Sequence, residues 1–114
     1  MRVLVFEDNL LWSSRLVRSL RATGHEPVLI DRAEWSPGEG QAEVAILNLG
    51  SPVWDAAALT SELRRLGVRV VGHAGHKEKD LLELGRQAGC DTVATNSEIT
   101  FKLEAVLRRA FETA

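Results

Sequence analysis

Two acidic residues stand together where the first apolar run of the chain ends. Glu7 and Asp8 directly follow the β-forming residues at 3–6. Paired carboxylates bind divalent cations such as Mg²⁺, which prefers hard anionic oxygen ligands. With only two anionic ligands, the pair predicts at most a weak Mg²⁺ site, and we expect no other cofactor. The alternative is an acidic turn at a helix N-terminus, where negative charge is favoured.

Other residue types that bind metals or phosphate show no recognised spacing. His73, His76 and Cys90 match no known ligand pattern, so we expect no zinc site there. Gly38 and Gly40 lack the full glycine-rich pattern of a phosphate loop and predict a connecting loop instead. Because Cys90 is the only cysteine, no internal disulfide can form, and a reducing cytoplasm is the simplest location.

The composition is typical of one compact domain. The chain has 114 residues, 45% of them hydrophobic and 26% charged, and we treat residues 1–114 as a single domain. A formal net charge of -2 and a pI of about 5.9 argue against a nucleic-acid partner, which favours a basic excess. No apolar run approaches the ~20 residues that span a bilayer, so we expect no membrane contact.

Apolar runs alternate with helical patterns along the whole chain. Strands are predicted at residues 3–6, 27–30, 44–47, 68–71 and 91–95. Helices are predicted at 9–23, 54–66 and 79–88, and Ser97 is the predicted cap of a last helix with the stripe Ile99, Leu103, Val106, Leu107 and Ala110. This alternation predicts an α/β fold with a parallel sheet between two helical layers. The segment 31–43 contains helix breakers, so the second helix should be short or absent.

Polar residues gather at the carboxyl ends of these strands, which is where doubly wound sheets place their functional sites. The first strand ends at Glu7 and Asp8, the third at Asn48, the fourth near His73 and Ala74, and the fifth at Thr95 and Asn96. We therefore expect the functional site at this edge of the sheet.

At these positions the chain resembles the receiver domains of two-component response regulators, over nearly its whole length. VLVFEDN resembles the family's first strand with its acidic pair. ILNLGSP resembles the segment that carries the phospho-accepting Asp, and GCDTVATNS resembles the fifth-strand segment that ends in Lys-Pro. The resemblance implies a flavodoxin-like, doubly wound, five-stranded parallel sheet in the order 2-1-3-4-5.

The chain departs from the receiver pattern at four positions. Asn48 stands where the family has the phospho-accepting Asp, and Ala74 stands where it has a phosphate-binding Ser or Thr. Asn96 replaces the family's Lys, and Val93 replaces its aromatic switch residue. A neutral amide is no nucleophile for an acyl phosphate, and without the Lys no cation balances phosphoryl charge. The four losses together predict that phosphoryl switching is absent.

Each of the three tryptophans follows a strand: Trp12, Trp35 and Trp54. In a parallel sheet all three should lie toward the carboxyl-end face, where they would form an apolar rim around the acidic pocket. Because tryptophan is enriched in binding hot spots, we interpret this rim as a partner-binding surface. The alternative is that the rings fold down and cover the core where the second helix is short.

The sequence thus predicts a non-phosphorylatable, receiver-like signalling domain that acts by protein–protein contact and is not an enzyme. Its partner would be another signalling protein or a second copy of the chain. The resemblance also implies a dimer face built from the helix at 79–88, the fifth strand and the last helix. Candidate members of that face are Leu82, Phe101, Lys102 and Arg109.

Two alternatives stay open. The domain could take a phosphate on an unusual residue, with Asp31 or Ser51 the nearest substitutes. It could also be a small-molecule sensor on the same scaffold. The segment EDNLLW after the first strand is acidic and apolar and should repel phosphate, so the ligand would be uncharged and apolar.

Overall fold

The computed structural model describes residues 1–35 and 41–112, which build one five-stranded sheet. The strands are β1 (Arg2–Phe6), β2 (Glu26–Ile30), β3 (Val44–Asn48), β4 (Arg69–Ala74) and β5 (Thr92–Thr95). Every neighbouring pair runs parallel, and the order is β2-β1-β3-β4-β5. The predicted flavodoxin-like strand order is therefore confirmed.

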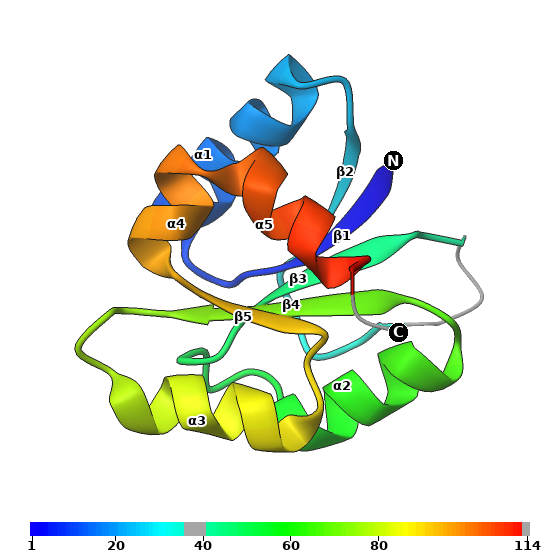
Figure 1. Cartoon of the computed structure of the whole chain (residues 1–114). Helices are drawn as coiled ribbons and strands as arrows, with labels where there is room; N and C mark the ends of the chain where they lie inside the picture. The colour runs from blue at the N-terminus through cyan, green and yellow to red at the C-terminus, as the bar shows by residue number, and fades with distance from the viewer. Residues whose placement is uncertain (36–40, 113–114) are drawn as a thin grey trace.

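Helices cover both faces of the sheet (Figure 1). They are α1 (Leu10–Ala22), α2 (Ala56–Arg65), α3 (Lys79–Ala88), α4 (Asn96–Phe101) and α5 (Leu103–Ala110). α1, α4 and α5 lie on one face, and α2 and α3 lie on the other. In residues 1–35 and 41–112, no helix combines the length and the apolar character needed to cross a membrane.

The connection from β2 to β3 contains no helix in its described residues, 31–35 and 41–43. This agrees with the prediction that the second helix is short or absent. The predicted loop glycines Gly38 and Gly40 lie outside the described residues. From the described part, the half-buried Trp35 and Ala42 pack against the core. Side chains of a loop thus cover part of this face of the sheet.

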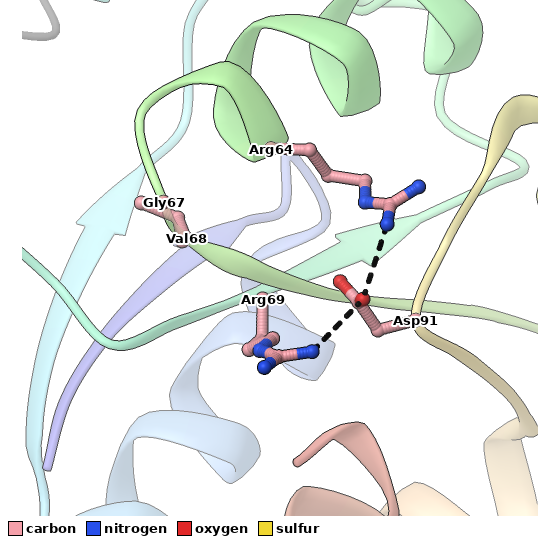
Figure 2. Close-up of a pocket in the computed structure, with 5 residues that line it drawn as sticks. All are labelled: Arg64, Gly67, Val68, Arg69 and Asp91. Carbon is pink, nitrogen blue, oxygen red and sulfur yellow. Dashed lines mark ion pairs between the residues drawn. The ribbon is translucent and has the colours of Figure 1, made fainter. Parts of the chain in front are cut away.

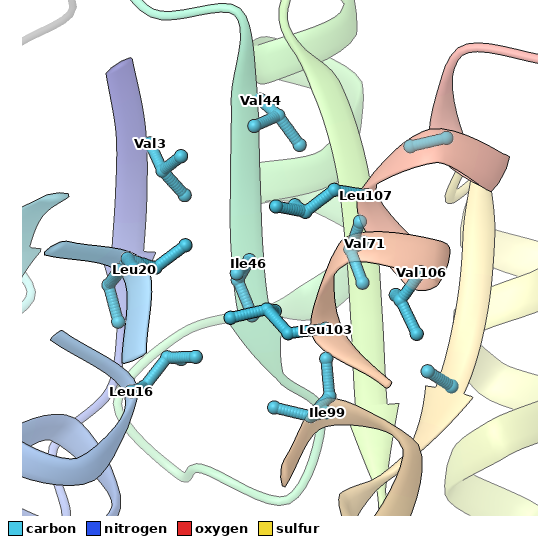
Figure 3. Packing of buried hydrophobic residues seen from close by; sticks show 13 residues of the cluster. Val3, Leu16, Leu20, Val44, Ile46, Val71, Ile99, Leu103, Val106 and Leu107 are labelled. Carbon is cyan, nitrogen blue, oxygen red and sulfur yellow. The ribbon is translucent and has the colours of Figure 1, made fainter. Parts of the chain in front are cut away.

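The three interior strands, β1, β3 and β4, are buried on both faces. Alternate residues of a strand point to opposite faces, so in β1 Val3 and Val5 join one core cluster while Leu4 and Phe6 join the other. Burial of each such side chain contributes roughly 1.5–3 kcal/mol to stability. Figure 3 shows the first cluster, whose labelled members are Val3, Leu16, Leu20, Val44, Ile46, Val71, Ile99, Leu103, Val106 and Leu107.

The cap of the helix that follows β5 differs from the prediction. Thr95, not Ser97, is the N-cap of α4. The Thr95 hydroxyl accepts the backbone N–H of Glu98 at 3.1 Å, and the Glu98 carboxylate accepts the backbone N–H of Thr95 at 3.0 Å. Thr and Glu three residues apart form this reciprocal capping box, a pattern that Ser97 lacks.

The predicted last helix is in fact two segments, α4 and α5, separated by Lys102. Lys102 has φ −134° and ψ 35°, outside the helical region. Just before it, the Thr100 hydroxyl donates to the carbonyl of Asn96 at 2.9 Å, a bond that bends helices. The break leaves Phe101 with 81% of its surface exposed.

At the amino-terminal edge of the sheet, Asp91 joins the start of β5 to β4. Its side chain is 3% exposed, and its Oδ2 accepts the backbone N–H of Val70 at 2.7 Å. The backbone N–H of Asp91 donates in return to the Val70 carbonyl at 2.8 Å. The guanidinium groups of Arg64 and Arg69 lie 3.8 and 3.6 Å from Oδ1 (Figure 2). We therefore assign the cluster of Asp91, Arg64 and Arg69 a structural role.

We expect the substitution Asp91→Ala to lower the free energy of unfolding by about 1–3 kcal/mol, because it leaves the buried N–H of Val70 without an acceptor. The matched control is Asp31→Ala. Asp31 also lies 3.6 Å from a guanidinium, that of Arg32, but its side chain is 47% exposed. The control should change stability by less than about 0.5 kcal/mol. Urea unfolding followed by circular dichroism measures both, and equal losses would contradict the assignment.

Candidate functional site

The carboxyl ends of the strands bring four of the singled-out residues into two hydrogen-bonded pairs. Glu7 follows β1 and meets Asn48, the last residue of β3. His73 of β4 meets Asn96, the first residue of α4. Asn48 and His73 are register partners of the adjacent strands β3 and β4. The predicted edge of the sheet is therefore where these polar side chains converge.

Glu7 is a buried carboxylate held by neutral hydrogen-bond donors. It is 1% exposed, and the amide nitrogen of Asn48 lies 3.0 Å from its Oε1 and 2.9 Å from its Oε2. The backbone N–H of Asn9 also donates to Oε2 at 3.3 Å. A buried carboxylate without such donors would carry a large desolvation cost. These contacts satisfy it without a cation.

The orientation of the Asn48 amide follows from what lies on either side of it. The backbone N–H of Gly50 donates to Asn48 Oδ1 at 2.9 Å, so the oxygen faces the turn after β3. The NH₂ group consequently faces Glu7. An amide offers one acceptor side and one donor side, and both are used here.

This donor set does not fit Mg²⁺. The ion needs oxygen ligands in near-octahedral geometry, whereas an NH₂ group points at both oxygens of Glu7. Asp8, the second predicted ligand, is exposed while Glu7 is buried. Across the part of the chain that the structure describes, no three His, Cys, Asp or Glu side chains group so that they could hold a metal ion.

His73 and Asn96 form the second pair. The Nδ1 atom of His73 lies 2.7 Å from Asn96 Oδ1, and the ring of Trp12 lies beside the imidazole with centroids 6.2 Å apart. Burial lowers the pKa of His73, and the Asn96 contact and the charge of Glu7 oppose this shift. The imidazole is therefore neutral at pH 7, and Nδ1 donates to the Asn96 oxygen.

The sequence placed His73 near the carboxyl end of the fourth strand and offered it as a candidate metal ligand, but it did not predict the pairing with Asn96. The available signal was a single polar residue at the end of the apolar strand RVVGHA. Within that strand His73 lies on the same face as Val71, which packs under α1 and α5. A polar group on a buried face needs a partner, and Asn96 supplies it.

The other two residues of the predicted degenerate site are apolar neighbours of the core. Ala74 is buried in the cluster beneath α2 and α3, and Val93 is half-buried against the same cluster. A methyl group and an isopropyl group offer no hydrogen bond to a phosphoryl group. The structure thus brings Asn48 and Asn96 into the polar edge but leaves Ala74 and Val93 on its apolar side.

The three tryptophans do not share one surface. Trp35 and Trp54 pack edge-on against Phe6, at centroid distances of 5.4 and 5.6 Å. Trp12 instead lies beside His73, and its face carries the Arg15 guanidinium 5.6 Å away. Trp35 lies beside Phe6, the last residue of β1, and also lines a groove beside Leu4, so this ring covers the core as in the alternative stated above. Without a helix before β3 in the described residues, this ring covers the sheet itself.

Only two of the four residues predicted for the dimer face are available for contact in the structure. Leu82 is buried in the core beneath α3, so it is not available for contact. Arg109 is engaged within the chain, donating to Glu98 Oε2 at 3.0 Å and to the carbonyl of Val93 at 3.4 Å. Phe101 and Lys102 remain exposed, at the break between α4 and α5.

No protein-family model matches the sequence, and no curated protein matches it. Solved structures nevertheless match its fold. The receiver domain of the sensor histidine kinase PA1611 from Pseudomonas aeruginosa, with magnesium in its active site cleft, has a TM-score of 0.82 and 21% identity over 98% of both chains. The receiver domain of NtrX from Brucella abortus has a TM-score of 0.80 and 22% identity, over 98% of this chain and 99% of that one.

The chemotaxis protein CheY4 from Vibrio cholerae has a TM-score of 0.79 and 14% identity, over 96% of this chain and 98% of that one. At such identities the likeness establishes the architecture. The chain has the fold of response-regulator receiver domains.

The contact between Asn48 and Glu7 predicts the effect of restoring an acid. Asn48→Asp replaces a donor 2.9 Å from the Glu7 carboxylate with a second negative charge. Like charges ~4 Å apart repel by about 4 kcal/mol at an effective dielectric constant of 20, and we expect a net loss of ~2–4 kcal/mol in unfolding free energy. Millimolar Mg²⁺ should recover part of this loss, because the new carboxylate and Glu7 would then offer two anionic oxygen ligands of the kind that Mg²⁺ prefers.

The control for this variant is Gln87→Glu, the same amide-to-acid change on the exposed face of α3. It should alter stability by less than about 0.5 kcal/mol, with or without Mg²⁺. Urea titrations of both variants in each buffer provide the measurement. An Asn48→Asp variant as stable as the parent would contradict the proposed role of the amide.

The lowered pKa of His73 predicts a stability that depends on pH. The folded imidazole binds a proton less readily than the unfolded one, whose pKa is near 6.5. The contribution of His73 to stability is therefore fully present above that pH. It falls by up to ~1.4 kcal/mol per pH unit as the pH drops toward the folded pKa.

We expect His73→Gln to flatten the slope of unfolding free energy between about pH 5 and about pH 7. The control His76→Gln removes an exposed imidazole and should retain the parent's slope. Urea midpoints at intervals across this range measure the effect. A parent protein whose stability does not change with pH would show that His73 is not buried as a neutral base.

Proposed function

We propose that this chain is a receiver-like signalling domain that takes no phosphoryl group and acts through contact with other proteins. The observation that carries this proposal is the amide of Asn48. It ends β3 at the carboxyl edge of the sheet and directs its NH₂ group at Glu7. By resemblance, this is the position of the phospho-accepting carboxylate of receiver domains.

The chemistry of the site supports the absence of phosphoryl transfer. An acyl phosphate forms when a carboxylate oxygen attacks phosphorus, and an amide is no such nucleophile. The transferred group also needs positive charge around it. Here the place of the family's Lys is taken by Asn96, whose oxygen accepts a hydrogen bond from His73. Neither the donor set at Glu7 nor the methyl group of Ala74 compensates for that loss.

The surface beside this site supports a role in binding. Leu10 and Leu11 form the first turn of α1, directly after the acidic residues, and both are largely exposed. Their side chains lie next to Trp12 in the chain, at the same edge of the sheet. Exposed apolar groups at one edge are typical of protein contact sites. We propose another signalling protein as the partner and assign no enzymatic activity.

The alternative phosphorylation sites are less suited to the reaction. Ser51 is buried, and its hydroxyl oxygen accepts the backbone N–H of Val53 at 3.2 Å. Asp31 is accessible but lies beside the exposed Arg32, after the edge strand β2. The backbone N–H of Ser51 donates to the carbonyl of Asn48 at 3.2 Å, but no described side-chain contact joins Ser51 or Asp31 to Glu7 or to the Asn48 amide. The experiment below would nevertheless distinguish phosphorylation at Asp31 from phosphorylation at Ser51.

The test is incubation with acetyl phosphate and Mg²⁺, followed by intact-mass measurement. We expect no gain in mass, because position 48 offers no carboxylate nucleophile. The positive control, run under the same conditions, is the response regulator from Burkholderia pseudomallei whose solved structure carries a phosphorylated aspartic acid. A stoichiometric gain of one phosphoryl group on this chain would refute the proposal, and fragmentation would show whether Asp31, Ser51 or another residue carries it.

A further inference from the structure

β2 is an edge strand of the sheet and pairs with β1 alone (Figure 1). The backbone N–H of Glu26 donates to the carbonyl of Met1 at 2.9 Å, and the carbonyl of Ile30 accepts the N–H of Glu7 at 3.1 Å. Backbone groups of successive strand residues point to alternate sides, so the even-numbered residues of β2 bond to β1. The odd-numbered residues direct their backbone groups away from the sheet, as a row of unpaired donors and acceptors.

The surroundings of β2 leave this edge open. The connection that follows β2 contains no helix in its described parts, 31–35 and 41–43. Leu29 is the register partner of Val5, so its side chain lies on the face of the sheet that α1 covers, yet 40% of it is exposed. An open edge with an exposed apolar side chain at its centre is a surface on which another strand can pair.

The backbone of this edge matches a second copy of itself when the two strands run antiparallel about a two-fold axis at Leu29. The axis sets Leu29 opposite Leu29 of the partner subunit, and each N–H then donates to the other's carbonyl. It also sets the N–H of Asp31 opposite the carbonyl of Pro27 of the partner subunit. Because proline has no N–H, this outer pair forms one hydrogen bond, whereas the central pair is complete.

The side chains on the other face of β2 match under the same axis. Val28 and Ile30 are half-buried against the core cluster beneath α2 and α3. The axis sets Val28 opposite Ile30 of the partner subunit, and Ile30 opposite Val28 of the partner subunit. Cross-strand pairs of β-branched side chains stabilise antiparallel strands.

The charges at the two ends of the segment are self-complementary as well. Glu26, at the start of β2, is exposed, and the Arg32 side chain beyond its end is 79% exposed. The antiparallel arrangement brings Arg32 beside Glu26 of the partner subunit, at both ends of the contact. Opposite charges at matching positions favour a second copy of this strand over a strand without that pattern.

We propose that two copies of this chain pair antiparallel through β2, so that their sheets join into one continuous sheet across a two-fold axis at Leu29. The assembly is closed, because the axis uses the single β2 edge of each copy. This edge lies at the opposite end of the sheet from β5, and therefore apart from the dimer face that the resemblance implies. The contact uses no residue of the Glu7–Asn48 pair, so it goes beyond the proposed function and stands independently of it.

The first test is sedimentation equilibrium of the full chain and of Leu29→Pro. We expect the parent to dimerise and the variant to dissociate at least ~10-fold more readily, because both central N–H donors are lost. The N–H of Leu29 does not pair with β1, so circular dichroism should show a folded monomer. The control Leu29→Val keeps the N–H and an apolar side chain and should dimerise like the parent.

A cross-link gives a second readout that does not depend on the proline variant. Leu29→Cys, in a Cys90→Ser background, puts two thiols at the axis, with Cα atoms ~5.5 Å apart and within disulfide range. Mild oxidation should yield a covalent dimer on a non-reducing gel. The control Leu84→Cys, in the same background, has a similar exposure, 39% against 40%, but lies on α3 and should stay monomeric.

Three results would overturn the proposal. The first is a parent chain that stays monomeric at about 0.5 mM. The second is a dimer that a folded Leu29→Pro variant leaves intact. The third is equal cross-linking through positions 29 and 84, which also decides the question if Leu29→Pro does not fold.

Discussion

A carboxylate removed from water needs a cation or hydrogen-bond donors, and within residues 1–35 and 41–112 Glu7 is held by neutral donors. The amide of Asn48 reaches both of its oxygens, and the oxygen of the same amide holds the turn after β3 through Gly50. One neutral side chain thus links the end of β1 to the loop beyond β3. These hydrogen bonds satisfy the Glu7 carboxylate with neutral donors. The proposal of a domain that binds without switching depends on this contact.

The fold could be predicted because the pattern that determines it, a buried strand followed by a helix, is repeated along the chain. Short apolar runs buried on both faces, separated by helical stripes, leave few arrangements open to Val3, Val44 and Val71. The errors lie where one local bond decides the outcome. The reciprocal hydrogen bonds of Thr95 and Glu98 make Thr95, and not the predicted Ser97, the N-cap of α4. A break at Lys102 divides the predicted last helix into α4 and α5. The Thr-x-x-Glu spacing was visible in the sequence, whereas the φ of Lys102 depends on how Leu103 reaches the core.

The site could be predicted only as far as strand ends and resemblance reach. They located Glu7, Asn48 and Asn96 at one edge, because carboxyl ends of parallel strands meet there. The direction in which each side chain points could not be predicted, because it depends on rotamers and on partners distant in sequence. Asn96 turns to His73, 23 residues away, and Trp35 lies over the sheet face. Neither orientation follows from residue type or spacing, so both required coordinates.

The interior position of β1 in the sheet has a consequence for folding during synthesis on the ribosome. β1 comes first in the chain, yet it lies between β2 and β3, and its pairing of Val3 with Val44 waits for a much later segment. On the ribosome, its apolar side chains emerge well before that second neighbour exists. Such unpaired strand edges are the surfaces that chaperones cover and that drive misassembly. α1 and β2 follow β1 directly in the chain, so they are the first elements that can cover its apolar side chains and pair with its edge.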